Sequence, residues 1–313
     1  MTPPFTVRDQ LTLAALLAAD EDQQLIFLQD QHAAGLAPSN ATRPLHEHEL
    51  RAQARFADLE SDRDAAIAQL EPELQALHDL IKDTYTRELF GDDDDPDAEL
   101  PADEAIQRVH HLTTHQPEEV QEAEQRLLPV IAGVLAAQYV LGGRRVIQEA
   151  ERQGIPTSNT TPSQVGSETF QPGARAVTTH PWRRIGGKVE ETFTRPETIT
   201  RGSVSRRDVN RIMDTIVVDG TKDEARQQIN GVGGIGRIET VEANDELEPD
   251  EIWASAIMDG YACESCGGFD GVYFATLEEA RSYFPQGQNI MCQGGGRCRC
   301  LLVFIFRDPS ASA

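Results

Sequence analysis

The chain has 313 residues, of which 39% are hydrophobic and 6% aromatic, and its 28 Lys and Arg against 52 Asp and Glu give a formal net charge of −24. This length predicts about two domains, and this charge excludes broad binding to nucleic-acid phosphates. No secretory signal is recognised at the start. The longest apolar run, residues 127–143, is shorter than the ~20 residues of a membrane span. We therefore expect reduced cysteines in a cytoplasm and no membrane partner.

Charge and composition divide the chain into three parts. Residues 1–143 sum to −19, residues 144–212 to +5 and residues 213–313 to −10. We predict a mainly helical region over 1–153 that makes protein contacts, an extended basic linker or arm over 154–202, and a small α+β domain over 203–313. The predicted fold class is therefore α+β, with a cysteine cluster in the last part.

Helical periodicity dominates the first part. Apolar residues recur at spacings of three and four over 67–81, which is one helix face, and Pro72 predicts a kink or restart within it. Gly91 and the acidic run that follows it predict a solvated loop. A further helix is expected over 117–153, with a bend at Pro129.

Residues 154–202 are rich in Pro, Gly, Ser and Thr and lose this periodicity, which predicts the linker. Trp182 lies here among Arg183, Arg184 and Lys188. An aromatic ring amid cations is typical of stacking and phosphate contacts with nucleic acid. The alternative is an extended segment that one Trp pins to a neighbouring part of the protein, and the pattern favours this alternative.

The last hundred residues predict a compact mixed domain. Helices are expected over 205–216 and 221–230, capped by Ser203 or Ser205 and by Thr221. The run GVGGIGR, residues 231–237, predicts a flexible turn rather than a phosphate loop. Strands are expected in EIWASAIMDG and CRCLLVFIF, a hairpin in CGGFDGVYF, and a helix in TLEEARSYF that opens with a capping box of Thr276 and Glu279.

All five cysteines lie in the last fifth of the chain. The spacing of Cys263 and Cys266 lets both sulfurs face one centre, which is half of a tetrahedral zinc site. The other half is expected from Cys292 and Cys298, with Cys300 as a buried thiol beside them and the alternative ligand. The predicted cofactor is a structural Zn²⁺.

Other uses of the cysteines stay open at this point. They are reduced thiols packed in a core, disulfides, or a catalytic nucleophile. Catalysis is disfavoured because all histidines lie at or before His180, so the last domain offers no imidazole base. We predict no catalytic residues and no enzymatic activity.

The order of elements in the last part resembles a known family. EIWASAIMDG, CESCGGFDGVYF, TLEEARSYFPQG and CQGGGRCRCLLVF follow one another as in the Mu F-like minor head proteins of tailed phages, the phage head morphogenesis family. The resemblance covers roughly residues 203–305. One departure is that many members have a His shortly before the CRC element, where this chain has GGGR, and Cys292 would take its place.

The resemblance implies a function. Proteins of this family are minor capsid components at the portal vertex and support head assembly and DNA packaging, retention or ejection. We therefore expect a virion location inside the capsid near the portal, and the host cytoplasm during assembly. The implied partners are the portal protein, the major capsid or scaffold protein, and packaged DNA through Arg183, Arg184 and Lys188, with an oligomeric state in the virion. The alternative is an effector or toxin enzyme packaged in the virion, with the N-terminal half as its active domain.

Overall fold

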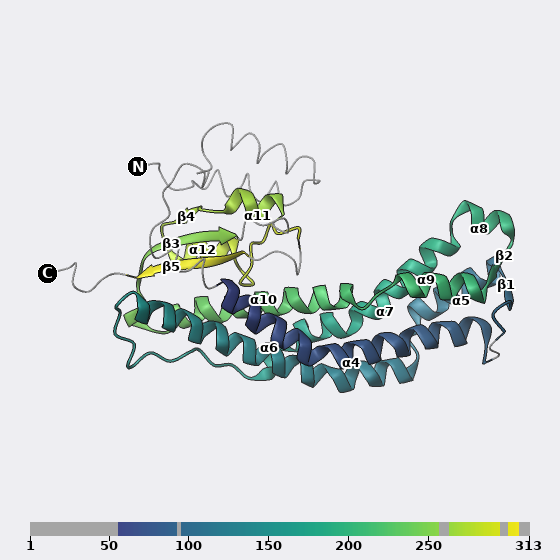
Figure 1. The fold of residues 1–313 in the computed structure, drawn as a ribbon, viewed down its shortest axis with the longest axis horizontal. Coiled ribbons are helices and arrows are strands. Elements are labelled where there is room, and N and C mark those ends of the chain that lie inside the picture. Colours follow the sequence, from purple (N-terminus) through teal and green to yellow (C-terminus); the bar gives the residue numbers. More distant parts are fainter. Residues whose placement is uncertain (1–55, 93–94, 257–262, 295–299, 307–313) are drawn as a thin grey trace. The chain divides into compact units, whose positions relative to one another are not determined.

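The computed structural model describes residues 56–92, 95–256, 263–294 and 300–306 (Figure 1). The predicted helical region before residue 56 lies outside the described part. The described residues form two compact units. Unit 1 contains Ala136–Val165 and the described residues before Asp64 and after Gln228, and unit 2 contains Asp64–Leu135 and Gly166–Gln228. This division differs from the predicted boundaries at 153 and 202, because each unit combines segments that are distant in the sequence.

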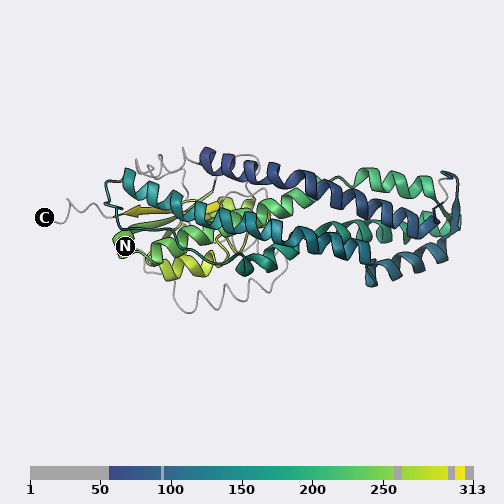
Figure 2. The same cartoon turned by 90° about the horizontal axis from the view of Figure 1, so that it is seen from below.

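Unit 2 is mainly helical. Its helices are α4 (Phe56–Phe90) from Asp64 onward, α5 (Ala102–Thr114), α6 (Glu118–Arg152) up to Leu135, η1 (Ser167–Phe170), α7 (Gln171–Phe193), α8 (Pro196–Arg201), α9 (Arg206–Thr215), and α10 (Asp219–Glu242) up to Gln228. Two short antiparallel strands, β1 (Glu99–Pro101) and β2 (Ser203–Ser205), pair within it. In Figures 1 and 2, α4 and α7 run beside each other, and the rings of Tyr85 and Trp182 stack between them at 4.6 Å.

Unit 1 carries the α+β part of the fold. The C-terminal parts of α6 and α10 are followed by η2 (Asp245–Leu247), β3 (Pro249–Ala256), α11 (Glu264–Phe269), β4 (Tyr273–Phe274), α12 (Leu277–Tyr283) and β5 (Cys300–Phe306). The antiparallel sheet has the order β4-β3-β5, with Ile252 opposite both Phe274 and Phe304. Its apolar face shares one core with Val146 and Ile238, from the ends of α6 and α10. The predicted mainly helical α+β class is therefore confirmed.

Some backbone amides and carbonyls of β5 are not bonded to β3, and side chains form hydrogen bonds with them instead. Gln153 donates from Nε2 to the carbonyl of Phe304 at 3.0 Å and accepts from the amide of Phe306 at 2.9 Å. Arg237 donates to the carbonyl of Leu302 at 3.2 Å. The side chains of Arg237, in α10, and of Gln153, directly after α6, thus occupy polar groups that an open sheet edge leaves available for another strand.

The glycine run over 231–237 is helical, so the predicted turn is wrong. It lies inside α10, and its glycines are required by close packing rather than by turn geometry. A Cβ on Gly236 would collide with the backbone carbonyl of Tyr139, and one on Gly142 with that of Gly233. In unit 1, α6 and α10 therefore meet backbone to backbone, which only glycine permits at these positions.

The predicted extended linker over 154–202 holds only for its first part. Residues 155–166 contain no helix or strand, whereas α7 and α8 are helical and the extended prediction is wrong for them. Val177, Ile185 and Val189 are fully buried along α7. Burial of this face outweighs the weak helix propensity of a segment that contains Pro and Gly.

The prolines predicted to interrupt helices do not end them. Pro72 lies inside α4 and Pro129 inside α6. The predicted restart at Pro72 is therefore wrong: Leu70 and Leu74, on either side of it, are fully buried, and packing of this face stabilises the helix across the lost hydrogen bond.

Most predicted elements of the last hundred residues are confirmed. Ser205 caps α9 with a capping box, and Thr276 accepts from the amide of Glu279 at 3.1 Å to begin α12. Thr221 is not a cap, because α10 already begins at Asp219. In the predicted hairpin CGGFDGVYF, the first residues form α11 instead, and only Tyr273 and Phe274 pair as a strand.

One helical stretch, Ala102–Arg152, is long and apolar enough by composition to cross a membrane. Within its most apolar window, 44% of the residues are buried in the structure. The core helix of a soluble protein has the same features, so this stretch is weak evidence for a membrane span.

Candidate metal centre

The first two cysteines of the cluster lie at the start of α11. Cys263 is the N-cap residue, and its sulfur accepts from the amide of Cys266 at 3.4 Å. Its sulfur also accepts from the backbone of Gln293. Cys266 is buried with 1% exposure in the first turn of the helix. The two-residue spacing therefore folds as predicted, with both sulfurs directed to the same place.

Two further cysteines approach this pair from other segments. Cys292 follows α12, and its sulfur lies within 4.8 Å of those of Cys263 and Cys266. Cys300 is the first residue of β5 and is 8% exposed, and its thiol interacts with the sulfurs of Cys266 and Cys292. In a zinc tetrathiolate with Zn–S bonds of about 2.3 Å, the sulfurs lie about 3.8 Å apart. A contraction of at most about 1 Å would bring the three sulfurs to that separation.

Asn289 supports the cluster and was missed in the sequence. It is buried, its amide lies 3.4 Å from the sulfur of Cys300, and its Nδ2 lies 3.9 Å from that of Cys266. Its Oδ1 accepts from the amide of Met291 at 2.9 Å, which shapes the turn before Cys292. The signal in the sequence was the pair Gly287 and Asn289, because Gly and Asn are both typical of tight turns. In the structure, the φ of Gly287 is indeed positive.

The four thiols interact through shared protons. Hydrogen bonds with Cys266 and Cys292 lower the pKa of both Cys263 and Cys300. The hydrogen bond with Cys263 raises the pKa of Cys266 and of Cys292. A metal ion binds thiolates, so its binding here would displace protons from the cluster.

Among the described residues, four cysteines are free thiols. Three of them, Cys263, Cys266 and Cys292, lie close enough together to hold a metal ion. The structure brings together Cys263, Cys266 and Cys292 as predicted, and it adds Cys300, the predicted alternative. Cys298 lies outside the described residues. The described part of unit 1 contains no histidine, so it offers no imidazole to activate a cysteine nucleophile.

A buried ion pair lies beside the cluster. Arg237 and Glu149 form two parallel hydrogen bonds of 2.7 Å, and their side chains are 4% and 7% exposed. The Nε of Arg237 has no hydrogen-bond partner among the described residues. Two charges of opposite sign are thus held in the core, and removal of one leaves the other uncompensated.

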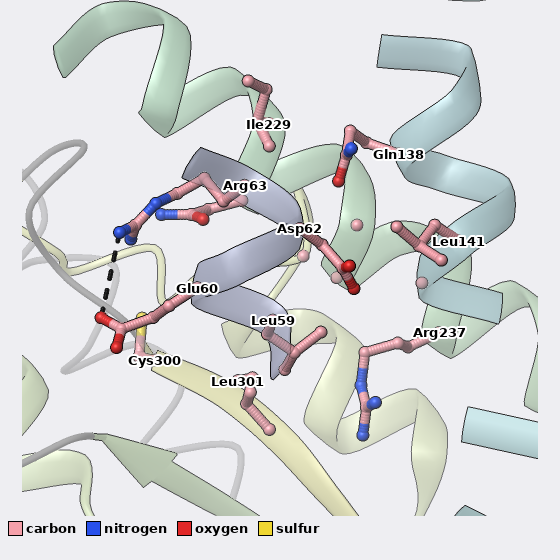
Figure 3. Close-up of a pocket in the computed structure, with 15 residues that line it drawn as sticks. Leu59, Glu60, Asp62, Arg63, Gln138, Leu141, Ile229, Arg237, Cys300 and Leu301 are labelled. Atoms are coloured by element: carbon pink, nitrogen blue, oxygen red, sulfur yellow. Dashed lines mark ion pairs between the residues drawn. The ribbon is translucent and has the colours of Figure 1, made fainter. Parts of the chain in front are cut away.

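A small cavity of about 70 Å³ adjoins this pair (Figure 3). Arg237, Cys300, Asp62 and Gln138 are among its lining residues, and Figure 3 shows Glu60 and Arg63 as an ion pair at its side. Asp62 is held by Arg145 at 2.6 Å. The charged side chains that line the cavity are therefore all in ion pairs, either with each other or with Arg145 and Glu149 next to it.

The predicted DNA contacts lie on α7 of unit 2. Arg183 and Arg184 are exposed, and Arg184 donates to the carbonyl of Val217 at 3.0 Å. Lys188, one turn further, pairs with Glu191 at 2.7 Å. Trp182 is 6% exposed and packs on Tyr85, so it is an anchor of α7 and not a stacking platform for bases. The cations thus share a helix, and Trp182 pins this segment to a neighbouring helix, as the favoured interpretation predicted.

Comparison with known proteins gives no family for this geometry: no protein-family model, curated protein or solved structure matches the chain.

Proposed function

We propose that the protein is a non-enzymatic minor head protein of a tailed phage, which associates with the portal vertex and supports head assembly and DNA packaging, retention or ejection. The observation that carries the proposal is the ordered series of motifs from EIWASAIMDG to CRCLLVF. In support, these motifs form neighbouring elements of one unit, in which β3, α11, α12 and β5 surround the cysteine cluster.

The test is the protein composition of purified phage particles. Mass spectrometry of particles from the phage that encodes the chain should detect it in a few copies per portal ring. The portal protein, co-expressed with the full chain, should co-purify with it. A chain that is missing from particles, and that the portal protein does not retain, contradicts the proposal.

The bound metal in this proposal is a structural zinc. Thiolates are soft ligands that favour zinc over magnesium or calcium, and the cluster draws its sulfurs from α11, the turn after α12 and β5. A metal that joins these three segments would stabilise a sheet of only three strands.

The proposal assigns local DNA contact to Arg183, Arg184 and Lys188. The bond from Arg184 to a carbonyl leaves its charge uncompensated, so it can still face a phosphate. Replacement of the three by Ala should weaken DNA retention and reduce its salt dependence. The matched control replaces Arg207 and Arg211, exposed cations of α9, and should leave retention unchanged. Equal DNA retention in the triple variant and the wild type contradicts this assignment.

The alternative of a packaged effector enzyme requires a pocket with convergent titratable groups in the N-terminal half. The cavity near Asp62 and Glu60 does not favour it, because these carboxylates already pair with Arg145 and Arg63. Within residues 56–155, apart from the undescribed 93–94, we find no observation that favours the enzyme over the head protein.

A further inference from the structure

Four sulfurs converge in unit 1, and a tetrahedral metal takes four ligands. Cys263, Cys266 and Cys292 lie within 4.8 Å of one another. Cys300 lies beside them: the backbone amide of Asn289 is 3.4 Å from the sulfur of Cys300, and its Nδ2 is 3.9 Å from that of Cys266. Cys300 is not part of this mutually close group of three, so its sulfur would have to move towards them to complete a tetrahedral site.

We infer that Cys300 is the fourth ligand of a zinc tetrathiolate with Cys263, Cys266 and Cys292. This inference deepens the structural zinc of the proposed function and rests on it. The four coordination positions are then filled, so this assignment predicts that zinc binding does not require Cys298.

The hydrogen bonds around the sulfurs suit thiolate ligands. Cys263 accepts from two backbone amides, those of Cys266 and Gln293. Cys300 accepts from the amide of Asn289, whose side chain also reaches Cys266. A zinc tetrathiolate carries a net charge of about −2, and donors directed at the sulfurs compensate part of that charge and orient the ligands.

Burial also favours Cys300 as a ligand. It is 8% exposed and belongs to the apolar core, where it contacts the sulfurs already described. Cys300 begins β5, and the next residues on the same side of the strand, Leu302 and Phe304, are buried in that core. The register of β5 against β3 pairs Cys300 with Ala256, so the sheet itself sets the position of the fourth ligand.

The first experiment uses single-residue variants of the full chain. Cys298→Ser should bind one zinc per chain with unchanged affinity. Loss of a residue that only supports a metal ligand lowers metal affinity roughly 10–100-fold. Cys300→Ser removes a ligand itself, so its zinc affinity should fall by more than that. With Co²⁺ as the probe, thiolate-to-metal absorption should fall in Cys300→Ser and stay unchanged in Cys298→Ser. The opposite pattern, with metal lost only in Cys298→Ser, would overturn the assignment.

A second measurement needs no variant and therefore does not depend on whether Cys300→Ser folds. The wild-type chain is alkylated with and without a chelator, and the modified peptides are identified by mass spectrometry. Zinc should protect Cys263, Cys266, Cys292 and Cys300 and leave the reactivity of Cys298 unchanged. Protection of Cys298 with modification of Cys300 contradicts the inference.

Failure of this inference is distinguishable from failure of the proposed function. A chain that binds no zinc and is not stabilised by it overturns both the ligand assignment and the structural zinc. The head-protein proposal is decided separately by the composition of phage particles. A chain that is found in particles but binds no metal would retain the function and lose the site.

Discussion

The two units differ in how many of their buried polar side chains form hydrogen bonds. In unit 1, Arg237 and Glu149 pair in the core, and Asn289 and Gln153 bond to the cluster and to the backbone of β5. Among the described residues of unit 1, Nε of Arg237 is the one buried polar side-chain atom left without a hydrogen-bond partner. In unit 2, several buried polar atoms have no hydrogen-bond partner among the described residues, including Nδ1 of His78, the hydroxyl of Tyr85 and Oγ1 of Thr221. Unit 1 therefore pairs most of its buried polar side chains, whereas unit 2 leaves more of them without a partner among the described residues.

The chain's two tryptophans allow this difference to be measured unit by unit. Trp253 lies on β3 of unit 1, and Trp182 lies on α7 of unit 2. In a Trp182→Phe background, fluorescence reports unfolding of unit 1, and in a Trp253→Phe background it reports unit 2.

The largest expected effect comes from the buried ion pair. Glu149→Ala leaves Arg237 charged and unpaired in the core of unit 1, and should lower the free energy of unfolding by about 3–5 kcal/mol. Urea unfolding followed by Trp253 fluorescence measures this loss. The double variant Glu149→Leu with Arg237→Met is the control and should recover most of the stability. If the double variant is as unstable as the single one, the loss reflects packing and not an unpaired charge.

A smaller effect is expected from the glycines that allow α6 and α10 to approach. Gly236→Ala places a methyl group against the carbonyl of Tyr139 and should destabilise unit 1 by about 2 kcal/mol or more. Gly133→Ala is the matched control in unit 2, because no atom lies within 4 Å of the added Cβ. It should stabilise α6 by up to about 1 kcal/mol. Equal effects of the two variants on thermal unfolding would contradict the close helix contact.

The smallest effect concerns pH and unit 2. Burial, followed by the charge of Lys82, lowers the pKa of His78 from 6.5 to about 4. Between these values the unfolded chain binds a proton that the folded chain does not, so this histidine lowers stability as pH falls from 6.5 towards 4.

His78→Leu tests this contribution, with Trp182 fluorescence as the readout for unit 2. The variant should be at least as stable as the wild type at pH 7, because it removes the unpartnered Nδ1. Its stability should fall less steeply between pH 6.5 and 4. A wild type and variant with the same pH profile would show that His78 is already charged or exposed in the folded protein.

Local patterns predicted much of this fold. Helical periodicity predicted α4 and α6, and the capping signals at Ser205 and Thr276 mark the observed starts of α9 and α12. These features depend on residues within one or two turns of each other, so they can be read without knowledge of the fold. The convergence of Cys263, Cys266 and Cys292 was also predicted, because a CxxC turn directs two sulfurs to one centre.

The failed predictions share one physical cause. GVGGIGR and the segment of α7 have weak helix propensity, and both are helical because other segments bury their faces. Glycine is required at position 236 because the carbonyl of Tyr139 lies where a Cβ would be. Tyr139 is 97 positions earlier in the sequence. No local pattern contains this information.

The sequence by itself determined the α+β class, most helices and the cysteine pair of α11, because propensity, caps and a two-residue spacing are local properties. The tertiary structure alone decided which segments form each unit, why α10 tolerates four glycines between residues 231 and 236, and that Cys300 joins the cluster. These outcomes depend on which distant segments pack against each other. There, the free energy gained by packing exceeds the free energy of local helix or strand propensity.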